Sequence, residues 1–239
     1  MTPAARYAIY QTPHPDSALW SLASRWLGRD AATGVATERP SVSGLANCNL
    51  DRLTAVPRHY GFHGTLKAPF EPAAGFDEAD LRAAMRDFAR SRSPFEVPLG
   101  VELLGDFLAL RPLQPSSALD ELHRDCVREF DVFRAPIAAD DLARRRHKRL
   151  TPEQDTYLAR WGYPYIFDHF RFHMTLTSRI ACRNSLEAMR AAVDALFASL
   201  LVEPVAFDGI ALFAQPDRET PFRLLGWYPF RGPAPPLER

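Results

Sequence analysis

The chain has 239 residues, of which 46% are hydrophobic and 11% aromatic, enough for a packed globular core. Its 29 basic and 29 acidic side chains cancel, which excludes a strong overall field toward DNA, RNA or an anionic membrane. The three cysteines lack a Cys-x-x-Cys spacing and are odd in number, which argues against a disulfide framework or a cysteine zinc site. No apolar signal core or membrane-length apolar run is present, so we expect a cytoplasmic protein without DNA or membrane partners.

The first quarter of the chain predicts a strand, a helix and a long connection. Residues 6–11 are β-prone and end at turn formers. Apolar side chains then recur at helical spacing from Asp16 or Ser17, and Gly28 is a plausible end of that helix. Residues 29–56 are rich in Gly, Ser, Thr, Pro and Asn without periodicity, so we expect an irregular connection that either edges a binding site or forms a surface loop.

The middle of the chain predicts helices separated by a hairpin. Asp77 is expected to cap a helix that runs to about residue 91, and residues 95–104 and 107–111 read as two strands around a Gly-Asp turn. A further helix is expected to begin at Ser116 or Ser117 and to run to about residue 133. A charged segment from Asp140 then ends in the basic run 144–149, which reads either as a solvated helix terminus or as a basic lip for a phosphate-bearing substrate.

The last part of the chain repeats the order of the first. Thr151 and Gln154 form a capping box for a helix that ends at Gly162. A strand at about 167–180, a helix capped near Asn184, and strands at 205–213 and 223–230 follow. Each half thus contains a strand, a helix and two more strands, which indicates an internal duplication and a single α+β domain, residues 1–239, with two lobes that share a cleft.

A short motif occurs once in each half. Residues 62–66 and 172–176 both read Phe-His-x-Thr-Leu, 110 positions apart (173 − 63). Alternate side chains of a strand leave by opposite faces, so each copy presents its His and Thr on one face and its apolar side chains on the other. Two such strands facing each other would form a symmetric site from His63, Thr65, His173 and Thr175.

This set of side chains suits phosphodiester cleavage. Of two imidazoles in one site, one can accept a proton while the other donates one, and the hydroxyls can hydrogen-bond nonbridging phosphoryl oxygens. By strand parity Lys67 and Arg179 either bring a cation toward the phosphate or lie at the surface. Aromatic side chains could stack on a base or bind a phosphate, although such residues more often belong to the core: Tyr10, Tyr163, Tyr165 and Tyr228.

The doubled motif, with a similar length of chain on each side, resembles the 2H phosphoesterase superfamily, which includes RNA 2′,3′-cyclic phosphodiesterases and LigT-like RNA-end ligases. The longer runs at 61–70, 161–165 and 170–177 resemble its DUF1045 branch, whose genes lie beside phosphonate-degradation genes. The resemblance spans nearly the whole chain.

That resemblance implies a bilobal LigT-like α+β fold, with two antiparallel sheets and outer helices around a central cleft. It also implies hydrolysis of a cyclic phosphate or 2′–5′ phosphodiester, without a metal or other cofactor. One of His63 and His173 would be the general base and the other the general acid, and Thr65 and Thr175 would hold the phosphoryl oxygens. The implied substrate is a small nucleotide or ribose cyclic phosphate, with RNA ends as an alternative.

Two other readings use the same residues differently. His169 and His173 stand four apart, a metal-ligand spacing on a helix, but the segment between them reads as strand and no Cys or paired carboxylate completes a zinc set. The second reading is a noncatalytic nucleotide- or phosphate-binding module on the same fold. Retention of both His and both Thr favours the enzyme.

Overall fold

The structure is a computed structural model that describes residues 5–42, 47–146, 149–181 and 183–232. Cys182 lies outside these ranges, and Cys126 is a buried free thiol. The strands are β1 (Arg6–Gln11), β2 (Gly64–Phe70), β3 (Phe95–Val97), β4 (Leu99–Leu104), β5 (Phe107–Pro112), β6 (Met174–Thr175), β7 (Val205–Phe207), β8 (Gly209–Gln215) and β9 (Arg223–Pro229). The α-helices are α1 (Ala18–Leu27), α2 (Asn47–Leu53), α3 (Ala55–Tyr60), α4 (Glu78–Arg90), α5 (Ser117–Glu129), α6 (Ala139–Arg146), α7 (Pro152–Trp161) and α8 (Arg183–Phe197).

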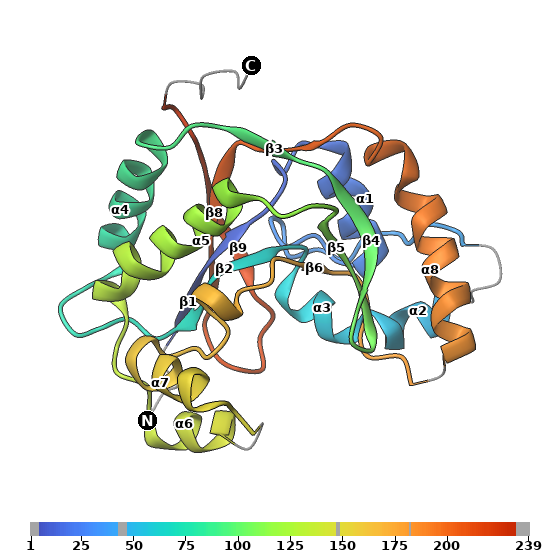
Figure 1. Cartoon of the computed structure of the whole chain (residues 1–239). Coiled ribbons are helices and arrows are strands. Elements are labelled where there is room, and N and C mark those ends of the chain that lie inside the picture. Colours follow the sequence, from blue (N-terminus) through green and yellow to red (C-terminus); the bar gives the residue numbers. More distant parts are fainter. Residues whose placement is uncertain (1–4, 43–46, 147–148, 182, 233–239) are drawn as a thin grey trace.

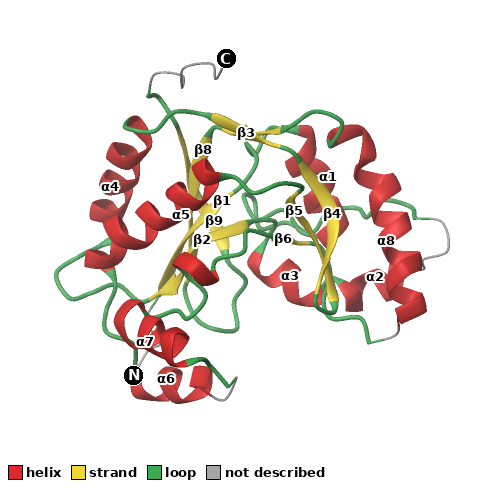
Figure 2. Cartoon of the chain, viewed as in Figure 1, coloured by secondary structure: helices red, strands yellow, loops and turns green. Residues whose placement is uncertain are grey.

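Seven strands form one antiparallel sheet in the order β4-β5-β6-β2-β1-β8-β9, and β3 pairs with β7 in a separate ribbon. Helices flank the strands on both sides of the molecule (Figures 1 and 2). The predicted α+β class with antiparallel sheets and outer helices is therefore confirmed. The two strands that carry the motifs, β2 and β6, are neighbours in this sheet and meet at a bridge where Gly64 lies opposite Met174.

The motifs and the β3 and β7 strands of the two halves are related by the same offset of 110 residues. The strand β3, Phe95–Val97, corresponds to β7, Val205–Phe207, and the two pair antiparallel with each other. The bridge partners Gly64 and Met174 also differ by 110 (174 − 64) and occupy the same place in their motifs. Equivalent residues thus lie opposite each other, and a local pseudo-twofold axis passes between the two motifs.

Each side of the molecule combines elements from both halves. On one side, Leu81 and Met85 of α4 and Cys126 of α5 share an apolar core with Ile210 and Leu212 of β8. On the other side, apolar residues of α1 and α8 share a core with β4, β5 and the second motif. In Figure 1 the green helices α4 and α5 of the first half lie beside the red strands of the second half, and the orange helix α8 of the second half lies beside the green strands β4 and β5.

Helix starts follow the capping residues that the sequence predicted. The side chains of Ser17, Asp77, Ser116 and Thr151 each accept a hydrogen bond from a backbone N–H of the first turn. Asp77 and Thr151 form complete capping boxes. The side chains of residues 183–185 are not described, so the predicted cap of α8 stays a prediction. None of the helices in the described ranges has the length and apolar composition that crossing a bilayer requires.

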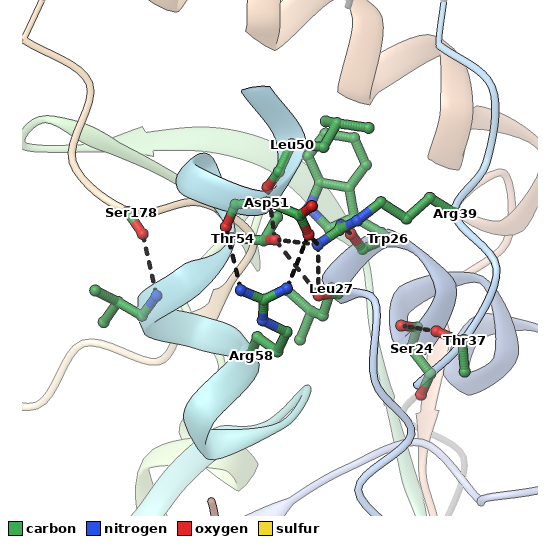
Figure 3. Close-up of polar contacts among 11 residues, drawn as sticks. Ser24, Trp26, Leu27, Thr37, Arg39, Leu50, Asp51, Thr54, Arg58 and Ser178 are labelled. Carbon is green, nitrogen blue, oxygen red and sulfur yellow. Dashed lines mark hydrogen bonds and ion pairs between the residues drawn. The ribbon is translucent and has the colours of Figure 1, made fainter. Parts of the chain in front are cut away.

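The connection after α1 is held in place by Arg39 rather than being a loose loop. The Arg39 side chain is 8% exposed, and its guanidinium donates to the carbonyl oxygens of Trp26 and Leu27 at the end of α1. It also binds Thr54 at 3.0 Å and the Asp51 carboxylate at 2.7 Å (Figure 3). Because a cation at a helix C-terminus satisfies its free carbonyls, this network fixes α2 and α3 against α1 in front of the first motif.

Three predicted strands are shorter or divided. Residues 95–104 split at Pro98, and 205–213 split at Asp208, because the chain passes there from the β3–β7 ribbon to the main sheet. The predicted strand 167–180 is wrong in extent: residues 167–169 form a 3-10 turn, and only Met174–Thr175 is a strand. Beyond Thr175 the backbone N–H groups of Leu176 and Thr177 both donate to the Leu108 carbonyl, which ends the regular ladder.

Candidate functional site

The β2–β6 bridge brings the two motifs together. Because the strands are antiparallel and Gly64 lies opposite Met174, the register carries His63 toward Thr175 and Thr65 toward His173. Gly64 and Met174 are buried on one face, so the two His and two Thr side chains leave by the other. The predicted constellation of four residues therefore converges across the pseudo-twofold axis.

Gly64 is required at this bridge by a neighbouring ring. A Cβ added to it would lie 2.3 Å from a ring carbon of Phe172, the apolar residue of the second motif. Trp26 of α1 is fully buried behind the same motif and donates its indole N–H to the Leu176 carbonyl at 2.7 Å. Packing around Phe172 and the hydrogen bond to the Leu176 carbonyl thus fix the backbone from which the His and Thr side chains extend.

His63 is held as a neutral proton acceptor. Its Nδ1 lies 2.9 Å from the Gly61 carbonyl oxygen, to which it donates, and its Nε2 then accepts from the Thr65 hydroxyl at 3.2 Å. The Tyr10 ring stacks on the imidazole with a centroid separation of 3.7 Å. Burial lowers the pKa of His63 to about 4, and nearby His173 adds to the effect.

His173 repeats this arrangement in the second motif. Its Nδ1 donates to the carbonyl oxygen two residues earlier, at Arg171, over 2.7 Å. Burial lowers the pKa of His173 below its ordinary value, and the positive charge of Arg111 adds to this. Since both rings use Nδ1 for a local backbone contact, both keep Nε2 for exchange of a proton.

Two adjoining cavities meet at Thr65. One, of about 380 Å³, is lined by His63, Thr65 and Thr175. The other, of about 420 Å³, is lined by Thr65 and His173. Both share Ala68, Tyr163 and Tyr165 as wall residues, and both volumes fall in the range of small-molecule sites. A ligand centred at Thr65 can therefore reach a histidine on either side.

Three of the four predicted tyrosines, Tyr10, Tyr163 and Tyr165, line the cavities. Tyr165 lines both cavities, and Tyr10 lines the smaller one while stacking on His63. Tyr163 meets Tyr165 edge to face at 5.6 Å. Tyr228 instead belongs to the apolar core between β9 and α4.

Lys67 does not point toward His63 as strand parity predicted. Its ammonium is buried and donates to the Val127 carbonyl at 3.0 Å and to Asp131 at 3.1 Å, both outside the two cavities. The cause is an irregular register against β1, where Tyr10 lies opposite Thr65 but Ile9 lies opposite Lys67. Such a β-bulge shifts the alternation by one residue, so Ala68 lines the cavities instead.

Arg179 lies at the surface, the other placement that the sequence left open. Its side chain is 82% exposed and lies 3.5 Å from Asp106 in the β4–β5 turn. Neither of the two cavities includes it among the wall residues.

Two arginines near the motifs, Arg111 and Arg6, were not singled out by the sequence, whereas Arg144 and Arg145 belong to the basic run that it named as a possible lip for a phosphate. In the β5–β6 register Ala109 lies opposite Thr175 and Leu110 opposite Met174, which carries Arg111 toward His173 on the polar face. The Arg111 Nε is buried and has no hydrogen-bond partner among the described residues. Arg6, Arg144 and Arg145 line the smaller cavity. Alternation along 107–111 could have indicated the face of Arg111, but nothing local revealed which strand lies beside it.

The described ranges contain no group of three His, Cys, Asp or Glu side chains that could hold a metal ion. His169 lines the same cavity as His173, but it belongs to a 3-10 turn and its Nε2 lies 3.0 Å from the Glu153 carboxylate. The four-residue spacing of the two histidines is therefore not that of two ligands on one α-helix face.

The site defines a protein with two His-x-Thr motifs facing one composite cavity on an α+β fold. The model of a family described as "Protein of unknown function (DUF1045)" matches residues 65–223. This chain belongs to the DUF1045 family, as its sequence predicted.

Two curated relatives are similar over nearly the whole chain. Ribose 1,5-bisphosphate phosphokinase PhnN of Janthinobacterium sp. (strain Marseille) is 37% identical over 231 residues, which cover 95% of this chain and 51% of the relative. The protein of the same name from Laribacter hongkongensis (strain HLHK9) is 37% identical over 219 residues, covering 92% and 50%. The chain thus spans about half the length of these relatives.

Solved structures give weaker likenesses. The protein TT0787 of Thermus thermophilus aligns with a TM-score of 0.42 at 15% identity, covering 95% of this chain and 98% of that one. LigT of E. coli complexed with NADP+ aligns with a TM-score of 0.39 at 13% identity, covering 95% and 99%. At these scores neither likeness carries an argument about activity.

Proposed function

We propose that this chain is a metal-independent phosphodiesterase of the 2H type, acting on a cyclic phosphate or 2′–5′ phosphodiester of a ribose derivative. The observation that carries the proposal is the β2–β6 bridge, which sets His63, Thr65, His173 and Thr175 on one face at the junction of two cavities. Cleavage of a phosphodiester needs a base and an acid on opposite sides of phosphorus, and two histidines related by a pseudo-twofold axis supply them.

The environments of the two histidines favour a division of roles. His63 has its pKa lowered to about 4, so its imidazole is neutral above that pH. The Thr65 hydroxyl, which donates to His63 Nε2 in the free protein, turns to the phosphoryl oxygen when substrate binds and leaves Nε2 to accept a proton. The pKa of His173 is lowered less far. We therefore assign His63 as general base and His173 as general acid, with Thr65 and Thr175 as donors to the nonbridging oxygens.

In this mechanism a water molecule attacks phosphorus, and His63 Nε2 takes a proton from it. The new P–O bond forms as the P–O bond to the leaving sugar oxygen breaks, and His173 Nε2–H protonates that oxygen. The anionic phosphate raises the pKa of both imidazoles when it binds, which favours the protonated form that His173 must adopt. Arg111, beside His173, adds a positive charge next to the developing negative charge on the phosphoryl oxygens.

A ribose phosphate is the substrate class that fits best. The two curated relatives are named for a kinase of ribose 1,5-bisphosphate, and this chain matches half of each. The wall tyrosines, Tyr163 and Tyr165, offer ring faces and hydroxyls to a sugar. Participation in phosphonate metabolism, a cytoplasmic location and action on RNA ends belong to this proposal as well.

Turnover assays test the proposal directly. Wild type is assayed with 2′,3′-cyclic nucleotides, 2′–5′ oligonucleotides and ribose 1,2-cyclic phosphate, with and without a chelator. We expect chelator-resistant hydrolysis that falls about 10²–10⁴-fold in His63→Ala or His173→Ala, and about 10²–10³-fold in Thr65→Ala or Thr175→Ala.

His14→Ala is the matched control, because His14 lines neither of the two cavities and belongs to neither motif. We expect it to retain near wild-type turnover. Folded motif variants with undiminished rates would refute the site, and ligand binding without turnover of any ester would favour a binding module.

A further inference from the structure

Arg6 and Arg145 line the cavity of His63 from elements far apart in the sequence, the start of β1 and the helix α6. Figure 1 shows α6 and α7 beside the end of the sheet where β1 begins. The Arg145 guanidinium lies 5.4 Å from the centre of the Tyr163 ring. Arg6 Nε donates to the Gln215 side-chain oxygen at 3.0 Å, and its guanidinium lies 5.6 Å from the Phe222 ring.

Neither guanidinium has a carboxylate within ion-pair distance among the described residues. The nearby Asp141 is already bonded to Arg144 at 2.8 Å and to Arg218 at 2.5 Å, and Arg218 also lies 3.5 Å from Glu71. Four arginines therefore surround two carboxylates, which leaves an excess of two positive charges at this end of the cavity. Burial lowers the pKa of both Arg6 and Arg145 by more than the nearby Asp141 carboxylate raises it.

This basic end is separate from the motifs. Arg6 and Arg145 also line a small adjoining hollow of about 40 Å³ that none of the four motif side chains touches. Along β1, Arg6 stands four residues before Tyr10, which lies opposite Thr65, and four residues of strand span about 13 Å. One phosphate bound between the two threonines does not bridge that length.

We propose that Arg6 and Arg145 form a second anion site for a phosphate monoester, so that the substrate is a small sugar carrying both the reacting phosphodiester and a separate terminal phosphate. The proposal rests on the proposed phosphodiesterase for the position of the reacting group. A dianionic phosphate monoester neutralises the excess charge, and guanidinium groups bind its oxygens in forked geometry. The stretch between the two anion sites is walled by Tyr163 and Tyr165 and accommodates the sugar.

The first test measures binding of ribose 5-phosphate, which has the terminal phosphate but no reacting ester. Calorimetric titrations compare wild type with Arg145→Gln and with Arg146→Gln. Arg146 is the matched control, because it is the next residue of α6 and pairs with Asp155 outside the cavity. We expect the dissociation constant to rise about tenfold or more in Arg145→Gln, the effect of losing charge-assisted hydrogen bonds, and to stay at the wild-type value in Arg146→Gln.

Arg6→Gln is an independent variant on β1, and we expect it to raise the dissociation constant of ribose 5-phosphate by a similar factor. Thermal unfolding checks that each variant is folded. His63→Ala is expected to keep ribose 5-phosphate binding, since the two anion sites are separate. Inorganic phosphate is titrated in parallel, and if it binds as tightly as ribose 5-phosphate, the sugar phosphate assignment is overturned.

The second test compares kcat/KM for ribose 1,2-cyclic phosphate with and without a 5-phosphate. We expect wild type to prefer the 5-phosphorylated ester about tenfold or more, and Arg145→Gln to lose that preference while Arg146→Gln keeps it. Equal rates on both esters in wild type would overturn the inference and leave the phosphodiesterase intact. Ribose 5-phosphate binding that depends on Arg145, without turnover of any ester, would refute the phosphodiesterase and leave the anion site intact.

Discussion

The pH dependence of kcat/KM tests the roles assigned to the two histidines. In the free protein, burial lowers the pKa of His63 to about 4, and burial together with Arg111 lowers that of His173 from its ordinary 6.5. A base must be neutral and an acid protonated. The active fraction therefore rises as pH passes the pKa of His63 and falls as pH passes that of His173, which gives a bell with its acid limb near pH 4 and its alkaline limb below pH 6.5.

The fall of kcat/KM at neutral pH follows from the lowered pKa of His173. Above the alkaline limb kcat/KM falls tenfold per pH unit, so at about pH 7.5 it lies at least about tenfold below its maximum. The profile of kcat lies at higher pH than that of kcat/KM, because the bound phosphate anion raises the pKa of both imidazoles. Initial rates from about pH 4 to about pH 8, at constant ionic strength, measure both profiles.

The variant Arg111→Gln tests which histidine sets which limb of the pH profile. Removing this guanidinium raises the pKa of His173, so the alkaline limb moves to higher pH, while the acid limb set by His63 stays in place. A flat profile, or an alkaline limb of wild-type kcat/KM above pH 6.5, contradicts the two-histidine mechanism. If Arg111→Gln shifts the acid limb instead, the roles of the two histidines are reversed.

Three further changes probe how the fold supports the site. Gly64→Ala brings a Cβ within 2.3 Å of the Phe172 ring, and we expect a loss of about 1–3 kcal/mol of unfolding free energy in urea; no loss would mean that the ring is not fixed there. Lys67→Met should lower stability by about 1–3 kcal/mol, because it breaks the buried pair with Asp131, and should leave kcat/KM within about threefold; a large fall in rate would place Lys67 in the site. Burial lowers the pKa of His123 from 6.5 to about 4, so the unfolded chain takes up a proton that the folded state does not, and this residue alone lowers stability by up to about 3 kcal/mol as pH drops through that window. Because the pKa of His63 is lowered to a similar value, His123→Phe should reduce the pH dependence of stability without removing it, and an unchanged slope would assign the dependence to other groups.

The sequence predicted the elements whose signals are local. Capping residues and helical spacing located α1, α4, α5 and α7 to within a few residues, because a cap and an apolar stripe act within the segment that contains them. The doubled motif likewise predicted which four side chains converge. The split of strands at Pro98 and Asp208 and the short β6 depend on how the chain crosses between sheets, and no local pattern records that.

Strand alternation did not predict which cationic side chains line the site. Parity assigned Lys67 to the face of His63, but the bulge opposite Tyr10 and Ile9 turned it toward α5. The arginines that do line the cavity come from the first strand and from α6, which are far from both motifs in sequence. The basic run at 144–149 divides accordingly: Arg144 and Arg145 line the cavity, while Arg146 pairs with Asp155 on α7.

A symmetric pair of motifs yields an asymmetric pair of imidazoles because the neighbours of each motif are not duplicated. Both histidines use Nδ1 for the carbonyl two residues earlier, so the backbone gives them the same tautomer. The strand beside the first motif supplies Tyr10, which stacks on His63 and shields it from water, whereas β5 supplies Arg111 beside His173. An apolar ring favours a neutral base, and a guanidinium next to the acid favours both proton release and binding of the phosphate anion. The division of acid and base roles thus arises from the flanking strands, so replacing Tyr10 or Arg111 would perturb it although neither residue belongs to a motif.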